Sequence, residues 1–252
     1  MSNISIVIIT YNEEEALENT IKIARRLSDD VIVVDSFSTD KTIDIARFYG
    51  AKIFQRKWEG YSKQKNFGNR QAINDYVLSL DADEVMSEAL IKSIRGIMDA
   101  PNHDAYKFVR TNIFFGKKIK YGSNKKENVI RLFNKNKITW NGDLVHEGLE
   151  LNGASVGQLE GELLHYTAKD TNDYLIKSNK YSTLFAEQQY RKNKKPNFIK
   201  IYLSPIYTFI REYIFKLGLL DGFEGYFLAR QSANYCFLKY AKLKMMYRMN
   251  GQ

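Results

Sequence analysis

Short apolar runs alternate with amphipathic segments over residues 4–80 of the chain. The run Ile4–Thr10 is continuous and rich in β-branched residues, which is typical of a strand buried on both faces of a parallel sheet. Similar runs follow at Val31–Val34, Ala51–Phe54 and Tyr76–Leu80. Strand–helix alternation at this spacing predicts right-handed βαβ units. We therefore expect an α/β fold with a mixed, mostly parallel, Rossmann-like sheet flanked by helices.

Acidic residues precede the first helical segment. Glu13–Glu15 stand before Leu17 and Ile21, which have helical spacing. We expect these acidic residues in the first turn of the helix, where carboxylates favour the helix dipole, with Thr10 or Asn12 as the cap.

Beyond residue 80, the sequence pattern first becomes more strand-like and then helical. Tyr106–Arg110, Val129–Phe133 and Leu163–Tyr166 are short β-prone runs, whereas the chain from Asn172 onward is helical in pattern and rich in aromatic residues. We expect a domain over residues 1–170 and a helical C-terminal extension over residues 171–252, with a hinge near Pro196.

Polar residues follow three of the predicted strands at the point where each strand ends. Thr10-Tyr11-Asn12 follows the first strand, Asp35 the second and Asp81 the fourth. Ligands bind beyond the carboxyl ends of the strands in open parallel sheets. The topology alone therefore predicts a binding site at this edge.

The cluster Asp81-Ala82-Asp83-Glu84 predicts a metal site at the end of the fourth strand. Two carboxylates one residue apart can both reach one hard cation, and Mg²⁺ or Mn²⁺ often shares such ligands with substrate phosphates. A metal placed there would stabilise a departing diphosphate. The alternative is a helix cap with acidic residues in the first turn.

The formal net charge of +9 comes from the C-terminal part, because residues 191–252 hold 12 Lys and Arg against 3 Asp and Glu. Such an excess predicts contact with an anionic partner, or a solvated basic tail. Aromatic residues between the basic ones fit a helix in a membrane interface. A second core layer or a homo-oligomer contact is the alternative.

Composition also indicates where the protein works. The single cysteine, Cys236, fits a reducing compartment and a packing role. No signal peptide is apparent, and charged residues interrupt the most apolar stretch, Phe198–Leu220. We expect a cytoplasmic protein that is peripheral on the inner face of the membrane.

Several segments together resemble the family 2 glycosyltransferases of GT-A fold. They are Ser5–Glu13, Val33–Asp40, Gln64–Gly68 and Leu80–Glu84. The later segments Trp140–Glu147, Leu164–Tyr166 and Gly218–Gly222 resemble a bacterial subgroup that includes β-glucosyltransferases of the lipopolysaccharide core. The resemblance covers nearly the whole chain.

The resemblance implies a role for each matching position. Thr10, Tyr11 and Glu13 would line the nucleotide pocket. Asp35 would accept a hydrogen bond from a uracil-type base, with Lys65 and Asn66 nearby. Asp81 would lie near the ribose and diphosphate, and Asp83 would ligate the metal. The chain departs from the family at Ser36, where many members have a second carboxylate, and at Phe37, where they often have glycine.

Inverting transfer needs a general base on the acceptor side of the anomeric carbon. Asp143 and Glu147 are the candidates, and the His-Glu pattern of the family favours Glu147. His146 is a candidate for the proton acceptor or a diphosphate contact, or is a half-buried strand residue. His165 is either a metal or diphosphate ligand or a structural histidine. The five lysines of Lys117–Lys126 belong to a phosphate-closing or acceptor-binding loop, or to a solvated one.

Together with the resemblance, these observations predict an enzyme that moves a hexose from a UDP-sugar to a glycolipid or lipopolysaccharide-type acceptor, and the resemblance implies glucose as the hexose. The alternative is a non-catalytic scaffold that binds glycans or nucleotides. A nucleic-acid partner is not expected, because the sequence contains no recognised nucleic-acid module. A dinucleotide-dependent oxidoreductase is disfavoured, because no Gly-x-Gly-x-x-Gly follows the first strand.

Overall fold

The computed structural model describes residues 4–141, 148–168 and 170–249. Internal contacts divide the chain into two compact units. Unit 1 is Met1–Arg110 with Glu127–His165, and unit 2 is Thr111–Lys126 with Tyr166–Gln252. The division by contacts therefore runs after His165 and assigns the segment 111–126 to the second unit. That residues 1–170 and 171–252 differ in function stays a prediction.

Four parallel strands form one half of the main sheet in unit 1. They lie in the order β3-β2-β1-β4, and their bounds are Lys52–Gln55, Val31–Asp35, Ile4–Thr10 and Tyr76–Asp81. Every residue of β1 and β2 is buried, as their continuous apolar sequences predict. The four predicted strands are thus confirmed to within one residue at each end.

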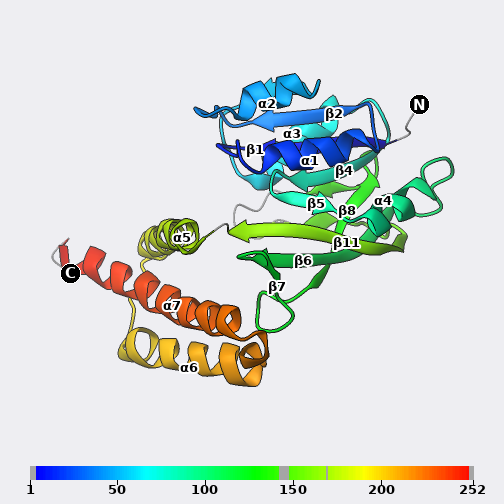
Figure 1. Ribbon diagram of the computed structural model, residues 1–252. Coiled ribbons are helices and arrows are strands. Elements are labelled where there is room, and N and C mark those ends of the chain that lie inside the picture. Colours follow the sequence, from blue (N-terminus) through cyan, green and yellow to red (C-terminus); the bar gives the residue numbers. More distant parts are fainter. Residues whose placement is uncertain (1–3, 142–147, 169, 250–252) are drawn as a thin grey trace. The chain divides into compact units, whose positions relative to one another are not determined.

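Antiparallel strands continue the same sheet beyond β4. The order β8-β6-β11-β5 follows, with bounds Glu127–Asn134, Ala105–Phe114, Val156–Ala168 and Glu84–Met86. β7 (Lys117–Lys118) pairs with β6, and β9 (Thr139–Trp140) pairs with β10 (Leu149–Glu150) in a small separate sheet. The parallel half and the helices that flank it confirm the predicted α/β class (Figure 1).

Helices cover both faces of the sheet in unit 1. α1 (Leu17–Arg25) and α4 (Glu88–Arg95) pack their apolar residues into one core cluster with α2 (Thr42–Phe48). α3 (Tyr61–Gln71) lies on the other face, where Phe67 packs against a second cluster that includes Val7 and Val34. The side chain of Ser87 accepts from the backbone N–H of Leu90 and so caps α4. The aspartates of the Asp81–Glu84 cluster are therefore not the cap of this helix.

The predicted beginning of the first helix is wrong. α1 begins at Leu17, so Glu13–Glu15 precede it and the acidic residue of its first turn is Glu18. The backbone N–H of Glu13 donates to Thr42 Oγ1 at 2.8 Å, and that of Glu14 donates to Asp40 at 3.2 Å. These long-range bonds tie the segment to Asp40 and Thr42, and they satisfy N–H groups that would have no intrahelical partner in a first helical turn either.

A buried carboxylate lies at the end of the sheet where the parallel strand β2 begins. Asp30 accepts from Ser5 Oγ at 2.5 Å, from the backbone N–H of Ile73 at 3.0 Å and from Lys52 Nζ at 2.7 Å. Burial alone would raise the pKa of Asp30, but these partners hold it below the ordinary value of 3.8. A depressed carboxylate pKa stabilises the fold at neutral pH, and this stability is lost as pH falls below about 4.

Asp30→Asn should therefore lower the free energy of unfolding by about 1–3 kcal/mol at neutral pH. The difference from wild type should shrink in acid, because the wild-type carboxylate is then protonated too. Urea denaturation at the two pH values would measure it. Asp29→Asn changes an exposed neighbour and serves as the control. A deficit that is the same at both pH values would contradict the charge-based explanation.

Unit 2 is helical, apart from short strand segments. α5 (Thr171–Arg191) is capped by Asp170, and α7 (Phe223–Met249) packs against it through Ala186, Leu243 and Tyr247. Between them lie η1 (Ile199–Leu203), α6 (Ser204–Ile210), η2 (Arg211–Phe215) and η3 (Gly218–Asp221) (Figure 1). The predicted helical character of the C-terminal part is confirmed. Among the helices described here, none combines the length and the apolar character needed to cross a membrane.

The lysine-rich loop of residues 117–126 is fastened within unit 2. The backbone N–H groups of Lys120 and Tyr121 donate to the buried carboxylate of Asp221, at 3.1 and 2.9 Å. Ile119 is buried in a cluster with Phe114 and Leu228. Buried groups of the helical part therefore hold the backbone of the loop, while its five lysines are exposed. A role of the loop in closing over phosphates or in binding the acceptor stays a prediction.

Candidate functional site

The sheet brings three predicted site residues to one edge. Thr10 of β1 is the register partner of Asp35 of β2, and Ile9 is the partner of Asp81 of β4. Thr10, Asp35 and Asp81 therefore end three adjacent parallel strands. The convergence predicted from the strand pattern is present in the structure.

Hydrogen bonds join the loops that follow β1 and β2. The backbone N–H of Asn12 donates to Ser38 Oγ at 2.8 Å, and that of Thr39 donates to Asn12 Oδ1 at 2.8 Å. Asn12 thus links two loops and does not cap α1. Its φ of 53° and the φ of 63° at Phe37 are left-handed, which is unusual for a bulky residue such as Phe37. Glycine adopts this conformation without steric cost, so the departure from the expected glycine puts a bulky residue in an unfavourable backbone conformation.

The side chain of Asp35 is buried and faces its own loop. It accepts hydrogen bonds from the backbone N–H of Ser38 at 2.9 Å and from Gln55 Nε2 at 3.2 Å, and also from Ser38 Oγ. Tyr11, in contrast, is 52% exposed. Asp35 shapes the loop of the expected nucleotide pocket. Its contact with a base, like the roles of Thr10, Tyr11 and Glu13, stays a prediction.

α3 supplies the remaining predicted residues of the pocket. Lys65 is fully buried, with Nζ 3.1 Å from Asp81 Oδ1 and 4.6 Å from the centre of the Trp140 ring. The amide of Asn66 donates to the carbonyl of Trp140 at 2.9 Å and accepts from its N–H at 3.0 Å. Asn66 therefore positions β9, and Lys65 pairs with the first aspartate of the cluster.

The carboxylate of Asp81 lies between two cations. Arg131 Nη2 is 3.3 Å from Asp81 Oδ2, opposite the contact with Lys65. Burial would raise the pKa of Asp81, but the charges of Lys65 and Arg131 hold it well below its ordinary value. Asp81 is therefore ionised at any physiological pH, and it compensates charges that the fold has buried.

Glu84 and two arginines complete this network. Glu84 is fully buried, accepts from the backbone N–H of Asp81 at 3.0 Å, and lies 3.3 Å from Arg110 Nη1 and 3.4 Å from Arg131 Nη2. The sequence did not identify Arg110 or Arg131 as site residues. The signal for Arg131 was an arginine within the otherwise apolar predicted strand Val129–Phe133, because a charge at such a position needs a buried partner. The signal for Arg110 was weaker, since its predicted strand also contains Lys107.

A turn after Asp81 brings Asp83 to His165. The chain leaves β4, enters β5 at the far edge of the sheet, and pairs there with β11, so that His165 is the register partner of Glu84. His165 Nε2 lies 3.4 Å from Asp83 Oδ2. Burial would lower the pKa of His165, but the charges of Asp83 and Glu84 raise it. The two predicted metal ligands thus lie side by side.

The Asp83–His165 pair fits one divalent ion as a partial ligand set. A carboxylate oxygen and an imidazole nitrogen at this separation can both bind the same cation. Over the described ranges, His, Cys, Asp and Glu residues form no group of three or more that could hold a metal. Two protein ligands are what a site needs when substrate phosphates supply the others.

Three of the predicted residues lie outside the described part of the chain. They are the base candidates Asp143 and Glu147, and His146. Their roles stay predictions.

Comparisons with known proteins identify the family. The family model of glycosyl transferase family 2 matches residues 5–150. An uncharacterized glycosyltransferase of Rickettsia typhi is 30% identical, over 97% of this chain and 87% of its own length. The lipopolysaccharide core biosynthesis glycosyltransferase LpsC of Rhizobium meliloti is 29% identical, over 99% of this chain and 94% of its own length.

The chain is also similar to a solved structure, that of S. aureus TarS 1-349 in complex with UDP-GlcNAc. It is 15% identical, with a TM-score of 0.49 over 99% of this chain and 92% of that one. The family model spans more than half of the chain, and the rickettsial relative matches nearly all of it. This chain therefore belongs to family 2 of the glycosyltransferases and has the GT-A fold.

Proposed function

We propose that this glycosyltransferase moves a hexose from a UDP-sugar to a glycolipid or lipopolysaccharide-type acceptor, with inversion and with the help of a divalent metal ion. The observation that carries the proposal is the strand edge itself. Three adjacent strands end at Thr10, Asp35 and Asp81, and the next turn places Asp83 beside His165. The proposal takes the loops after these strands as the nucleotide site and the Asp83–His165 pair as the metal site.

The charges of the site support a metal. Among the described residues around the Asp81–Glu84 cluster, the basic side chains of Lys65, Arg110 and Arg131 are paired with its carboxylates and with Glu127. The charges of these three side chains are thus compensated within the protein, and a diphosphate would need another cation. Asp83 and His165 would hold Mg²⁺ or Mn²⁺, which would supply that charge to the leaving group. The metal, and its identity, belong to the proposal.

Residues of the chain itself account for the other steps of the reaction. Lys65 and Arg131 fix the carboxylate of Asp81, which lies where the ribose and diphosphate are expected. Glu147, or otherwise Asp143, takes the proton of the acceptor hydroxyl as the new bond forms. A base on the acceptor side gives direct displacement at the anomeric carbon, and therefore inversion.

The acceptor class rests on the relatives. LpsC of Rhizobium meliloti is named as a lipopolysaccharide core biosynthesis enzyme and aligns with almost all of this chain. A glycolipid acceptor would place the protein at the cytoplasmic face of the membrane as a peripheral protein. Glucose as the transferred hexose follows from the subgroup that the sequence resembles.

Nucleotide and metal binding can be tested by thermal unfolding. We expect UDP with Mn²⁺ to raise the stability by about 2.7 kcal/mol at a hundredfold excess over its dissociation constant, and each component alone to give less. UDP release on incubation with UDP-sugars and acceptor extracts then separates an enzyme from a non-catalytic scaffold, which would bind without turnover. If UDP with Mn²⁺ leaves the unfolding temperature unchanged, both the enzyme and the nucleotide-binding scaffold are refuted.

A further inference from the structure

The helical segment formed by η1, α6 and η2, with the turn into η3, presents its apolar residues to the solvent. We call these side chains the outer face. Each is between 36% and 71% exposed. The outer face consists of Phe198, Ile199, Tyr202, Leu203, Ile206, Tyr207, Ile210, Ile214, Phe215, Leu217, Leu219 and Leu220. Most follow one another at intervals of three or four residues, as one side of a helix requires.

The inner side of the same segment combines apolar and polar residues. Ile201 is buried there, and so are Thr208 and Glu212, with Ser204 half-buried one turn before Thr208. In a surface helix of a water-soluble domain, the apolar residues lie inside and the exposed side is polar. In this segment it is the exposed side that is mainly apolar.

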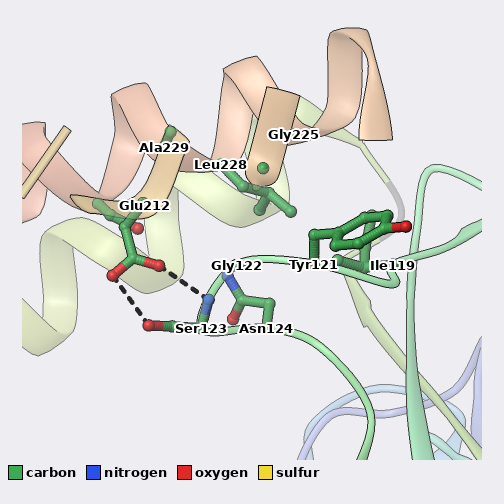
Figure 2. Close-up of a pocket in the computed structure, with 11 residues that line it drawn as sticks. Ile119, Tyr121, Gly122, Ser123, Asn124, Glu212, Gly225, Leu228 and Ala229 are labelled. Atoms are coloured by element: carbon green, nitrogen blue, oxygen red, sulfur yellow. Dashed lines mark hydrogen bonds between the residues drawn. The ribbon is translucent and has the colours of Figure 1, made fainter. Parts of the chain in front are cut away.

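Contacts within unit 2 provide hydrogen-bond partners for the polar residues of the inner side. Glu212 accepts hydrogen bonds from the N–H of Ser123 at 2.8 Å and from Ser123 Oγ at 2.9 Å, and Figure 2 shows both bonds. The cavity beside them has a volume of only about 10 Å³, enough for about one water molecule. The inner side is thus satisfied by the protein itself, and it is the outer face that needs a partner.

The charges around the outer face all have one sign. Residues 191–220 contain seven Lys and Arg, and the single acidic residue among them is the buried Glu212. Lys194, Lys195 and Lys200 are exposed at the beginning of the segment. An exposed apolar helix side with flanking cations is complementary to an anionic membrane interface.

A groove next to the outer face has the same character. It has a volume of about 630 Å³ and is lined by residues of η1 and α6 and by residues of α7. Tyr202 and Ile206 of the outer face contribute to it, together with Phe237 and Arg230. An apolar groove with a cation in its lining can take an acyl chain that has an anionic headgroup.

We propose that the outer face lies in the interface of a bilayer that contains anionic phospholipid, with η1, α6 and η2 parallel to the membrane surface. The apolar side chains would enter the acyl boundary, and the ammonium groups of the exposed Lys194 and Lys200 would reach the phosphates. A second copy of the chain fits less well, because two outer faces would bring together charges of the same sign. This inference rests on the proposed function, and it adds to it the segment that binds the membrane and the class of lipid.

Vesicle flotation of the full chain tests the proposal. We expect binding to vesicles of equal parts phosphatidylglycerol and phosphatidylcholine, and at least tenfold weaker binding to phosphatidylcholine alone. Leu203→Asp with Ile214→Asp should weaken binding to the anionic vesicles at least tenfold. Phe48→Asp with Ile73→Asp is the matched control, because it places two charges on exposed apolar residues of unit 1. Lys194→Ala with Lys195→Ala, in an exposed loop, should weaken binding and lower its salt dependence.

Circular dichroism and UDP binding of each variant separate this proposal from the proposed function. Both should equal those of wild type while vesicle binding is lost. Equal vesicle binding by wild type and the Leu203/Ile214 variant would overturn the proposal. So would a wild-type dimer that binds no vesicles and becomes monomeric in that variant, because the outer face would then be a self-association surface. Failure of wild type to bind UDP would count against the proposed function alone.

Discussion

Asp83→Ala should lower the rate of sugar transfer by about a thousandfold or more while the chain stays folded. Asp83 is the proposed metal ligand, and a metal that stabilises a departing diphosphate contributes several kcal/mol to the transition state. The contact of Asp83 with His165 is 3.4 Å long and partly exposed. Its loss should therefore cost only about 1 kcal/mol of stability.

Initial rates of UDP release at saturating Mn²⁺ would measure the effect, and thermal unfolding would check the fold. Asp99→Ala removes an exposed carboxylate elsewhere in unit 1 and should have wild-type activity. Wild-type turnover by Asp83→Ala would show that the metal assignment is wrong. A variant that is inactive because it is unfolded would be recognised from its melting curve.

The parallel half of the fold was predictable from sequence because its signal is local. The runs that form β1, β2 and β4 are long enough, and buried enough, to specify a strand without knowledge of their neighbours, whereas β3 is only partly buried. The beginning of α1 was not predictable in this way. Glu13 has helix-favouring neighbours, but its N–H bonds to Thr42, which is 29 residues away.

The candidate site was predictable only where topology determines it. Strand ends fix the edge that holds Asp35 and Asp81, so their convergence follows from alternation alone. Of the two partners of Asp81, Lys65 comes from α3, and Arg131 comes from an antiparallel strand whose register the sequence does not specify. Arg131 is therefore found only in the structure. Asp83 and His165 were predicted singly as ligands, but their contact depends on the pairing of β5 with β11, which the sequence does not specify either.

The helical extension shows a different limit. The apolar positions between Phe198 and Leu220 have the spacing of a buried helix side, and the sequence left core, oligomer contact and membrane as alternatives. Spacing shows which residues share a side, but not which side faces inward. The buried contact between Glu212 and Ser123 settles that question for η2.

Asp81→Ala should affect stability far more than Asp83→Ala, although the two residues stand in one motif. Asp81 is the counter-ion of Lys65, which is fully buried, and of Arg131, which is nearly so. Removing one partner of a buried pair leaves an uncompensated charge, at a cost of about 3–5 kcal/mol. We expect that loss in urea denaturation of the variant, together with loss of UDP binding.

A second substitution distinguishes the structural role of Asp81 from its role in binding. In the double variant Asp81→Ala with Lys65→Met, no lysine charge is left buried without its partner, and Arg131 keeps its contact with Glu84 at 3.4 Å. Replacing both members of a buried ion pair is often close to neutral. Most of the lost stability should therefore return, but UDP binding should not, because the carboxylate expected beside the ribose and diphosphate is still missing. If the double variant does not regain stability, the charge that Asp81 compensates is that of Arg131 and not that of Lys65.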